Sequence, residues 1–139
     1  MVKTLYTATA TATGSGRDGQ VESSDRALVT DLSVPKELGG AGGDGTNPEQ
    51  LFAAGFAACF HSALQLVARK QKTSVAGSSV TAAVGIGPDG QGYGLTVTLE
   101  VDVPGVEPDT ARALADAAHQ VCPYSNATRG NIDVDVRVA

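Results

Sequence analysis

The chain has 139 residues and a mass of 14.0 kDa, which is the size of one domain, so we expect a single domain over residues 1–139. Its 10 basic and 15 acidic residues give a net charge of −5. This charge argues against nucleic acid or an anionic membrane as a partner, because both require a cationic surface. No secretory signal follows Met1, so the sequence predicts a cytoplasmic protein.

Hydrophobic residues make up 42% of the chain, but Ala supplies 21 of them and Val 16. Large side chains are few, with 3 Phe, 3 Tyr and no Trp. A chain of this length should bury roughly two-thirds of its unfolded surface. The core must therefore be built by close backbone approach or completed by a second subunit. The longest apolar run, Leu51–Phe60, is far shorter than the roughly 20 residues of a membrane span.

The N-terminal segment has a weak strand pattern. Thr and Ala alternate over Thr7–Thr13, and glycines mark a turn over Gly14–Gly19. The chain is then expected to return as a strand through Val21–Leu32.

A long helix is predicted from Pro48 to about Lys70. Asn47 is a suitable N-cap, Pro48 suits the first helical position, and Gln50 stands at the capping-box position. Basic residues near Lys70 suit the negative end of the helix dipole. The middle of the helix is apolar on every side, which is typical of a helix surrounded by protein.

A hairpin follows the long helix. Apolar residues alternate with polar or small residues over Val80–Ile86 and again over Leu95–Val103. The segment Gly87–Gly90 is the predicted turn between the two strands. A last strand with one polar face is predicted over Ile132–Val138.

A second helix is expected between the hairpin and the last strand. It begins at Pro108 and ends at Cys122, because Pro123 disfavours helical geometry in the residue before it. The element order predicts an α+β fold with a mainly antiparallel sheet packed against a buried helix. The inward positions of this second helix are Ala111, Leu114, Ala115, Ala118 and Val121.

The two cysteines are the first candidates for chemistry. Cys59 and Cys122 lie too far apart in the sequence for a CxxC pair or zinc-finger spacing. Two interpretations fit Cys59: a small buried hydrophobe with a raised thiol pKa, or a reactive thiol that needs a nearby cation. The candidate cation is Arg17 in the Gly14–Gly19 turn, for which the alternative is a solvated hairpin tip.

Glu49 lies in the first turn of the long helix, where the helix dipole alone explains an acidic residue. Ten helical residues, about 15 Å, separate it from Cys59. If Glu49 serves a site at Cys59, we therefore predict that it comes from a partner subunit packed antiparallel. The small residues from Ala53 to Ala58 permit such a close approach.

A zinc site is an alternative use of the cysteines, since His61 and His119 lie near them in sequence. Residues two apart on a helix point about 200° apart, so Cys59 and His61 cannot share an ion. At most three ligands remain, and we expect no metal. Both histidines are interpreted as surface or rim residues. The glycines of Gly39–Gly45 lack the pattern of a phosphate-binding loop.

Four blocks of the sequence form a combined pattern that is more specific than any one of them. They are Gly16–Gly19, Gly45–Gly55, Ala57–Phe60 and Val121–Asn131. Together they resemble the organic hydroperoxide resistance proteins, the Ohr branch of the Ohr/OsmC family. The resemblance extends from about Tyr6 to Val138.

The resemblance implies a thiol-dependent peroxidase that reduces organic hydroperoxides, including fatty-acid hydroperoxides, to alcohols. Cys59 matches the peroxidatic cysteine, which becomes a sulfenic acid, and Cys122 matches the resolving cysteine, which forms a disulfide with it. Arg17 and Glu49 match the pair that activates the thiolate. The implied fold is OsmC-like, an intertwined homodimer in which sheet encloses two long helices, with the sites at the interface. No bound cofactor is implied, and an external dithiol, a lipoyl group on a carrier protein, is the implied reductant.

Three apolar residues of the long helix are candidates for a substrate pocket, namely Phe52, Phe56 and Leu64. Plain core packing is the alternative for them. Two other functions remain open at this point. One is a non-enzymatic thiol–disulfide module of a stress response, and the other is a sister OsmC-type peroxidase with a different peroxide preference.

Overall fold

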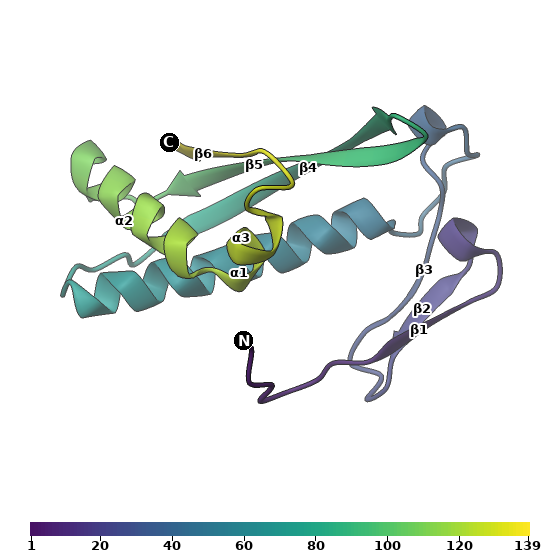
Figure 1. Cartoon of the computed structure of the whole chain (residues 1–139), viewed down its shortest axis with the longest axis horizontal. Helices are drawn as coiled ribbons and strands as arrows, with labels where there is room; N and C mark the ends of the chain where they lie inside the picture. Colours follow the sequence, from purple (N-terminus) through teal and green to yellow (C-terminus); the bar gives the residue numbers. More distant parts are fainter. The chain divides into compact units, whose positions relative to one another are not determined.

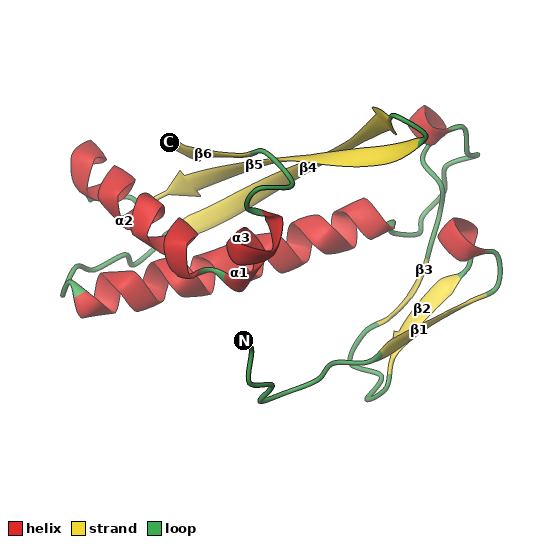
Figure 2. Ribbon diagram, viewed as in Figure 1, coloured by secondary structure: helices red, strands yellow, loops and turns green.

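The computed structural model describes residues 1–139, and their packing divides the chain into two compact units, Met1–Leu51 and Phe52–Ala139. Pairs of consecutive antiparallel strands are separated by helices, as expected for an α+β fold (Figure 2). In chain order the elements are β1 (Ala10–Thr13), a 3₁₀ turn (Gly16–Asp18), β2 (Gln20–Ser23), β3 (Val29–Asp31), a second 3₁₀ turn (Lys36–Leu38), α1 (Pro48–Lys70), β4 (Ser79–Asp89), β5 (Gly92–Asp102), α2 (Pro108–Val121), α3 (Pro123–Thr128) and β6 (Val134–Val138).

The first unit is a three-stranded antiparallel sheet in the order β1–β2–β3. The predicted turn after β1 is confirmed, and Gly14 and Gly16 have positive φ angles of 80° and 62° there. The prediction of one returning strand from Val21 to Leu32 is wrong, because the chain reverses between β2 and β3. In that reversal Asp25 Oδ1 accepts hydrogen bonds from Ser23 Oγ and from the backbone N–H of Ala27.

The predicted bounds of the long helix are confirmed by α1. Asn47 Oδ1 accepts a hydrogen bond of 2.8 Å from the backbone N–H of Gln50, so Asn47 is the N-cap. The reciprocal bond of a capping box, from the Gln50 side chain to the N-cap backbone, is not formed. Gln50 Oε1 accepts a hydrogen bond of 2.7 Å from Thr46 Oγ1 instead of reaching back to the N-cap backbone.

The second unit contains the sheet β4–β5–β6, in which β4 and β5 are antiparallel and β6 is parallel to β5. The predicted hairpin is confirmed, but its turn lies later than Gly87–Gly90. Asp89 pairs with Gly92, so the turn consists of Gly90 and Gln91. Gly90 has a φ of 60°, which suits a two-residue hairpin turn and which residues with a Cβ rarely adopt.

The core of this unit lies between α1, α2 and the inner face of the sheet (Figure 1). The alternation in β5 is confirmed, since Val97, Leu99 and Val101 are buried while Thr96 and Glu100 are exposed. The largest fully buried apolar side chains are Phe56, Phe60, Leu64, Leu99, Val101 and Leu114.

The second helix begins at Pro108 as predicted, but it ends at Val121, and the predicted last residue Cys122 is its extended C-cap. Four of its five predicted inward residues are buried. Val121 is the exception, because it is 48% exposed. The short helix α3 was not predicted. Pro123, which ends α2, occupies the first position of α3, where its missing N–H costs nothing.

Only one face of α1 is buried within a single chain. Every fourth residue on the opposite face is exposed, namely Ala54, Ala58, Ser62 and Leu66. The sequence predicts a helix surrounded by protein, and a single chain covers only one side of it. By length and composition alone α1 could cross a membrane. Its packing between sheet and helix in the core gives a sufficient reason for the apolar residues on the buried face.

Candidate active site

The sulfur atoms of Cys59 and Cys122 lie next to each other. Cys59 is half-buried on α1, and Cys122 is fully buried at the junction of α2 and α3. Both are free thiols, and their Sγ atoms are 3.7 Å apart, within hydrogen-bond distance for sulfur. A disulfide requires a separation of about 2.05 Å, so a displacement of about 1.7 Å joins them. The two cysteines can therefore bond without rearrangement of the fold.

The junction of the two helices fixes the backbone of Cys122. This residue caps both α2 and α3 in an extended conformation, with φ −66° and ψ 125°. Its N–H donates to the carbonyl oxygen of Ala118 at 2.9 Å, and its carbonyl oxygen accepts from the N–H of Asn126 at 3.0 Å. The thiol is thus placed by the ends of two helices.

The surroundings of Cys59 do not by themselves favour a thiolate. Burial raises the pKa of the Cys59 thiol, the neighbouring Cys122 adds to this increase, and a hydrogen bond from the backbone N–H of Tyr124 opposes it. The net direction is upward, which is the expectation for a buried thiol without a cation. A reactive Cys59 needs a positive charge in addition to these neighbours.

Arg17 and Glu49 form a bidentate ion pair within the first unit. The Nη1–Oε1 distance is 2.7 Å and the Nη2–Oε2 distance is 3.1 Å. The hydrogen bond to Glu49 raises the pKa of Arg17 above its ordinary value, and the charge of Glu49 adds to it. Two parallel bonds hold the planar guanidinium in one orientation. The predicted site residues thus come together as two pairs, one in each unit.

An aromatic cluster adjoins Cys59 on α1. The ring centroids of Phe52, Phe56 and Tyr124 lie 5.6–6.1 Å from one another. A Cβ on Gly55, one helical turn before Cys59, would lie 2.9 Å from the Tyr124 hydroxyl oxygen, so the ring would have to shift if this residue carried a side chain. Tyr124 was not among the predicted site residues, because its approach to α1 is a tertiary contact. Leu64 and Phe56 are fully buried, and core packing accounts for both; their role in a pocket stays a prediction.

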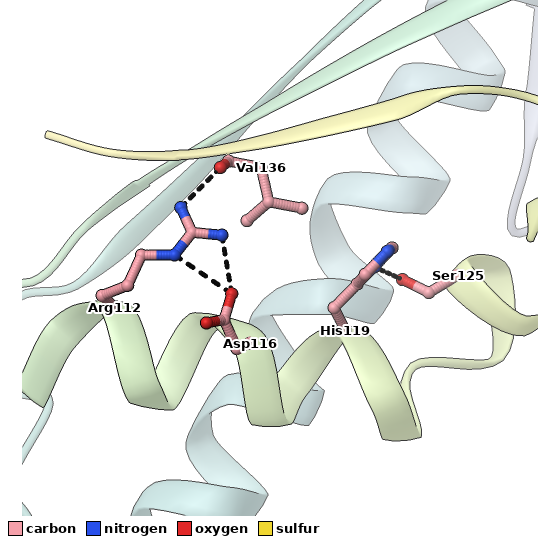
Figure 3. Close-up of polar contacts among 5 residues, drawn as sticks. All are labelled: Arg112, Asp116, His119, Ser125 and Val136. Carbon is pink, nitrogen blue, oxygen red and sulfur yellow. Dashed lines mark hydrogen bonds and ion pairs between the residues drawn. The ribbon is translucent and has the colours of Figure 1, made fainter.

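His119 occupies a rim position, one of the two places predicted for it. It is half-buried, and its Nδ1 lies 2.8 Å from the hydroxyl oxygen of Ser125, which is fully buried (Figure 3). Burial lowers the pKa of His119, and Arg129 adds to this effect. Both effects favour the neutral ring over the charged one.

A hydrogen bond connects α2 to the sheet two helical turns before His119. Arg112 donates to Asp116 Oδ1 on its own helix, and its Nη1 donates to the carbonyl oxygen of Val136 in β6 at 2.6 Å (Figure 3). No group of three or more His, Cys, Asp or Glu side chains is arranged to hold a metal ion.

Comparison with known proteins finds relatives over nearly the whole chain. The family model described as OsmC-like protein matches residues 40–137. The chain is 59% identical over 138 residues to the organic hydroperoxide resistance protein of Xanthomonas axonopodis pv. citri (strain 306), covering 99% of this chain and 96% of that protein.

Two solved structures share the fold over nearly the whole chain. The organic hydroperoxide resistance protein from Legionella pneumophila has a TM-score of 0.93 and 51% identity, covering 99% of each chain. The second is an organic hydroperoxide resistance protein from Vibrio cholerae O1 biovar eltor str. N16961, solved with captopril in one of its active sites. It has a TM-score of 0.91 and 53% identity, covering 98% of this chain and 93% of that one. This chain therefore belongs to the OsmC family, in its organic hydroperoxide resistance branch.

Proposed function

We propose that this protein is a cysteine-based peroxidase that reduces alkyl and fatty-acid hydroperoxides to alcohols. The observation that carries the proposal is the 3.7 Å separation of the Cys59 and Cys122 sulfur atoms. Two free thiols at this distance can be oxidised to a disulfide and reduced again, which is the cycle that a thiol peroxidase needs. Membership of the organic hydroperoxide resistance branch supports organic hydroperoxides as the oxidants.

The proposed reaction has two oxidative steps. The Cys59 thiolate attacks one oxygen of the hydroperoxide, the O–O bond breaks, and the alkoxide leaves and takes a proton to become the alcohol. Cys59 is then a sulfenic acid. The Cys122 sulfur attacks the sulfenic sulfur, and the S–O bond breaks. The thiol proton and the hydroxyl group leave together as water, and a Cys59–Cys122 disulfide remains.

Arg17 is proposed as the cation that Cys59 lacks. Its guanidinium favours the thiolate over the thiol and donates to the departing oxygen as negative charge develops there. Glu49 orients Arg17 through the bidentate pair, with distances of 2.7 and 3.1 Å. The pairing also limits the cost of removing the guanidinium from water.

The protein is proposed to act as a homodimer, in which Glu49 of one subunit serves Cys59 of the partner. Ten residues of helix, about 15 Å, separate the two positions along α1. The exposed positions Ala54, Ala58, Ser62 and Leu66 recur every four residues, the spacing at which helices pack through their i±4 ridges. The first three of these residues are small, which allows the backbones of two helices to approach closely.

An external dithiol is proposed to reduce the disulfide, and a lipoyl group on a carrier protein is the candidate. The Vibrio cholerae relative holds captopril, a thiol compound, in one of its active sites. This supports access of small thiols to such a site. No bound cofactor is needed, since the electrons pass through sulfur alone. The cytoplasm, where dithiol reductants are kept reduced, is the proposed compartment.

The aromatic cluster supports a preference for organic over hydrogen peroxide. Tyr124 is 38% exposed and Phe52 is partly buried, so both offer apolar surface, Phe52 within two helical turns of Cys59 and Tyr124 two residues after Cys122. An alkyl chain gains from burial against this surface, while hydrogen peroxide has no apolar part to bury.

Steady-state turnover tests the proposal. We expect continuous consumption of cumene hydroperoxide with dihydrolipoamide as reductant, and none by Cys59→Ser. Oxidation of one equivalent followed by no further turnover would favour a non-enzymatic thiol–disulfide module instead. Faster turnover of hydrogen peroxide than of tert-butyl hydroperoxide at equal concentration would favour a sister OsmC-type preference.

A further inference from the structure

Cys122 lies at the junction of α2 and α3, and a ring of three hydrogen bonds connects the two helices there. The proposed chemistry does not use this ring. His119 Nδ1 and Ser125 Oγ are 2.8 Å apart, joining the last turn of α2 to α3 (Figure 3). Arg129 Nη2 donates to the carbonyl oxygen of His119 at 2.6 Å, and the Arg129 N–H donates to the carbonyl oxygen of Ser125 at 3.0 Å. Cys122 lies between the two helices that this ring connects.

Breaking the His119–Ser125 hydrogen bond is energetically costly. Ser125 is fully buried, and His119 is the only hydrogen-bond partner of its hydroxyl group. A buried hydroxyl that loses its partner is left without water to replace it. The bond therefore holds α3 in one orientation at the end of α2.

This orientation determines where the Cys122 sulfur lies. The Cys122 N–H is bonded to Ala118 in α2, and its carbonyl oxygen is bonded to Asn126 in α3. A tilt of α3 against α2 therefore turns the residue between them. The Sγ atom is 3.7 Å from Cys59 Sγ, a distance at which a small displacement decides whether the two atoms can meet.

We propose that His119 and Ser125 are positioning residues that raise the effective concentration of the Cys122 thiol at Cys59. The inference rests on the proposed function for its peroxidase role, but the pairing of the two thiols can be measured without peroxide. Loss of the His119–Ser125 bond lets α3 tilt. The Cys122 attack on the sulfenic acid then slows, while formation of the sulfenic acid at Cys59 keeps its rate.

The primary test is the reduction potential of the Cys59–Cys122 disulfide, measured on the full chain in glutathione buffers. Ser125→Ala should lower the equilibrium constant for disulfide formation about tenfold, since misplacement by a fraction of an ångström to an ångström costs on the order of 10–100-fold. A tenfold loss corresponds to a potential about 30 mV higher.

A second readout separates a positioning role from a general loss of protein stability. After one equivalent of cumene hydroperoxide, Ser125→Ala should accumulate a sulfenic acid that dimedone traps, at the wild-type rate of peroxide consumption. His119→Leu should behave like Ser125→Ala. His119→Asn, which retains a polar atom near the position of Nδ1, should restore most of the wild-type potential.

The chain offers a matched control in a second His–Ser bond. His61 Nε2 and Ser78 Oγ are 2.9 Å apart at a part-buried position outside the α2–α3 junction. Ser78→Ala removes the same kind of bond by the same substitution, and it should leave the potential unchanged. An equal shift in Ser78→Ala, or a wild-type potential in Ser125→Ala, would overturn the inference.

The inference and the proposed function fail separately. A shifted potential in Ser125→Ala, in a protein whose wild type does not turn over hydroperoxide, supports the positioning role and refutes the peroxidase. Wild-type turnover combined with an unshifted potential and no trapped sulfenic acid refutes the positioning role alone.

Discussion

Replacement of Glu49 by Gln tests whether the Arg17–Glu49 pair serves chemistry or stability. The substitution keeps the size of the side chain and removes its charge, so the pair with distances of 2.7 and 3.1 Å loses its ionic character. The Glu49 side chain is 13% exposed, but the Arg17 side chain is 44% exposed, so water screens the pair from the Arg17 side; ion pairs screened in this way contribute only about 0.2–1 kcal/mol to folding. We therefore expect Glu49→Gln to lower the free energy of unfolding by less than about 1 kcal/mol.

The effect on catalysis should be far larger than the effect on stability. A guanidinium that is no longer held in one orientation stabilises the Cys59 thiolate less well, and we expect peroxide reduction to slow on the order of 10–100-fold. Stopped-flow consumption of cumene hydroperoxide measures the rate, thiol alkylation against pH measures the Cys59 pKa, and urea unfolding measures stability.

The control for Glu49→Gln is Asp135→Asn, which neutralises an exposed ion pair with Arg137, whose Nε–Oδ2 distance is 2.8 Å. It should change neither the rate nor the pKa of Cys59. An unchanged peroxide rate in Glu49→Gln would remove the pair from the mechanism. A loss of more than about 3 kcal/mol of stability would mean that the pair is structural, since removing one partner costs that much only when the other charge is left buried.

Three further predictions concern the second unit. Cys122→Ser should form the Cys59 sulfenic acid in a single turnover but not recycle through the disulfide; sustained wild-type turnover in this variant would refute the role of Cys122. Gly55→Ala should displace the Tyr124 ring, because the new Cβ would lie 2.9 Å from its hydroxyl oxygen. We expect a several-fold higher KM for cumene hydroperoxide and little change in the reduction of hydrogen peroxide. Equal effects on both substrates would contradict a pocket wall at Tyr124. His119 has a lowered pKa in the folded state, so the unfolded chain binds more protons as pH falls below the ordinary value of 6.5, and stability should fall with pH in that range. Urea unfolding should show a smaller pH slope for His119→Asn than for the wild type, and identical slopes would refute the assignment.

Much of the fold followed from local patterns. The cap at Asn47, the Pro at the start of α1 and the Pro after Cys122 are local signals. The predicted starts of α1 and α2 are correct, while α2 ends at Val121, before the predicted Cys122. The alternation in β5 was confirmed because one face of the sheet is buried and the other is not. The hairpin turn was placed too early because Pro88 and Asp89, which are typical turn residues, are paired with Tyr93 and Gly92 in the strands.

The rest of the site depends on tertiary contacts that no local pattern reveals. Tyr124 packs against α1 at Gly55, where a Cβ would lie 2.9 Å from its hydroxyl oxygen. The His119–Ser125 bond spans a helix junction that was expected to be the end of helical structure. A signal was present in the sequence, since Pro can begin a helix as well as end one, and a helix beginning at Pro123 would have placed Ser125 within reach of α2.

The proximity of the two sulfur atoms is the central claim, and the mass of the intact protein after one equivalent of cumene hydroperoxide tests it most directly. We predict that the monomer mass falls by two hydrogen atoms, and that peptide mapping finds Cys59 joined to Cys122 of the same chain. A lasting gain of one oxygen atom on Cys59, with Cys122 still a free thiol, would contradict the account.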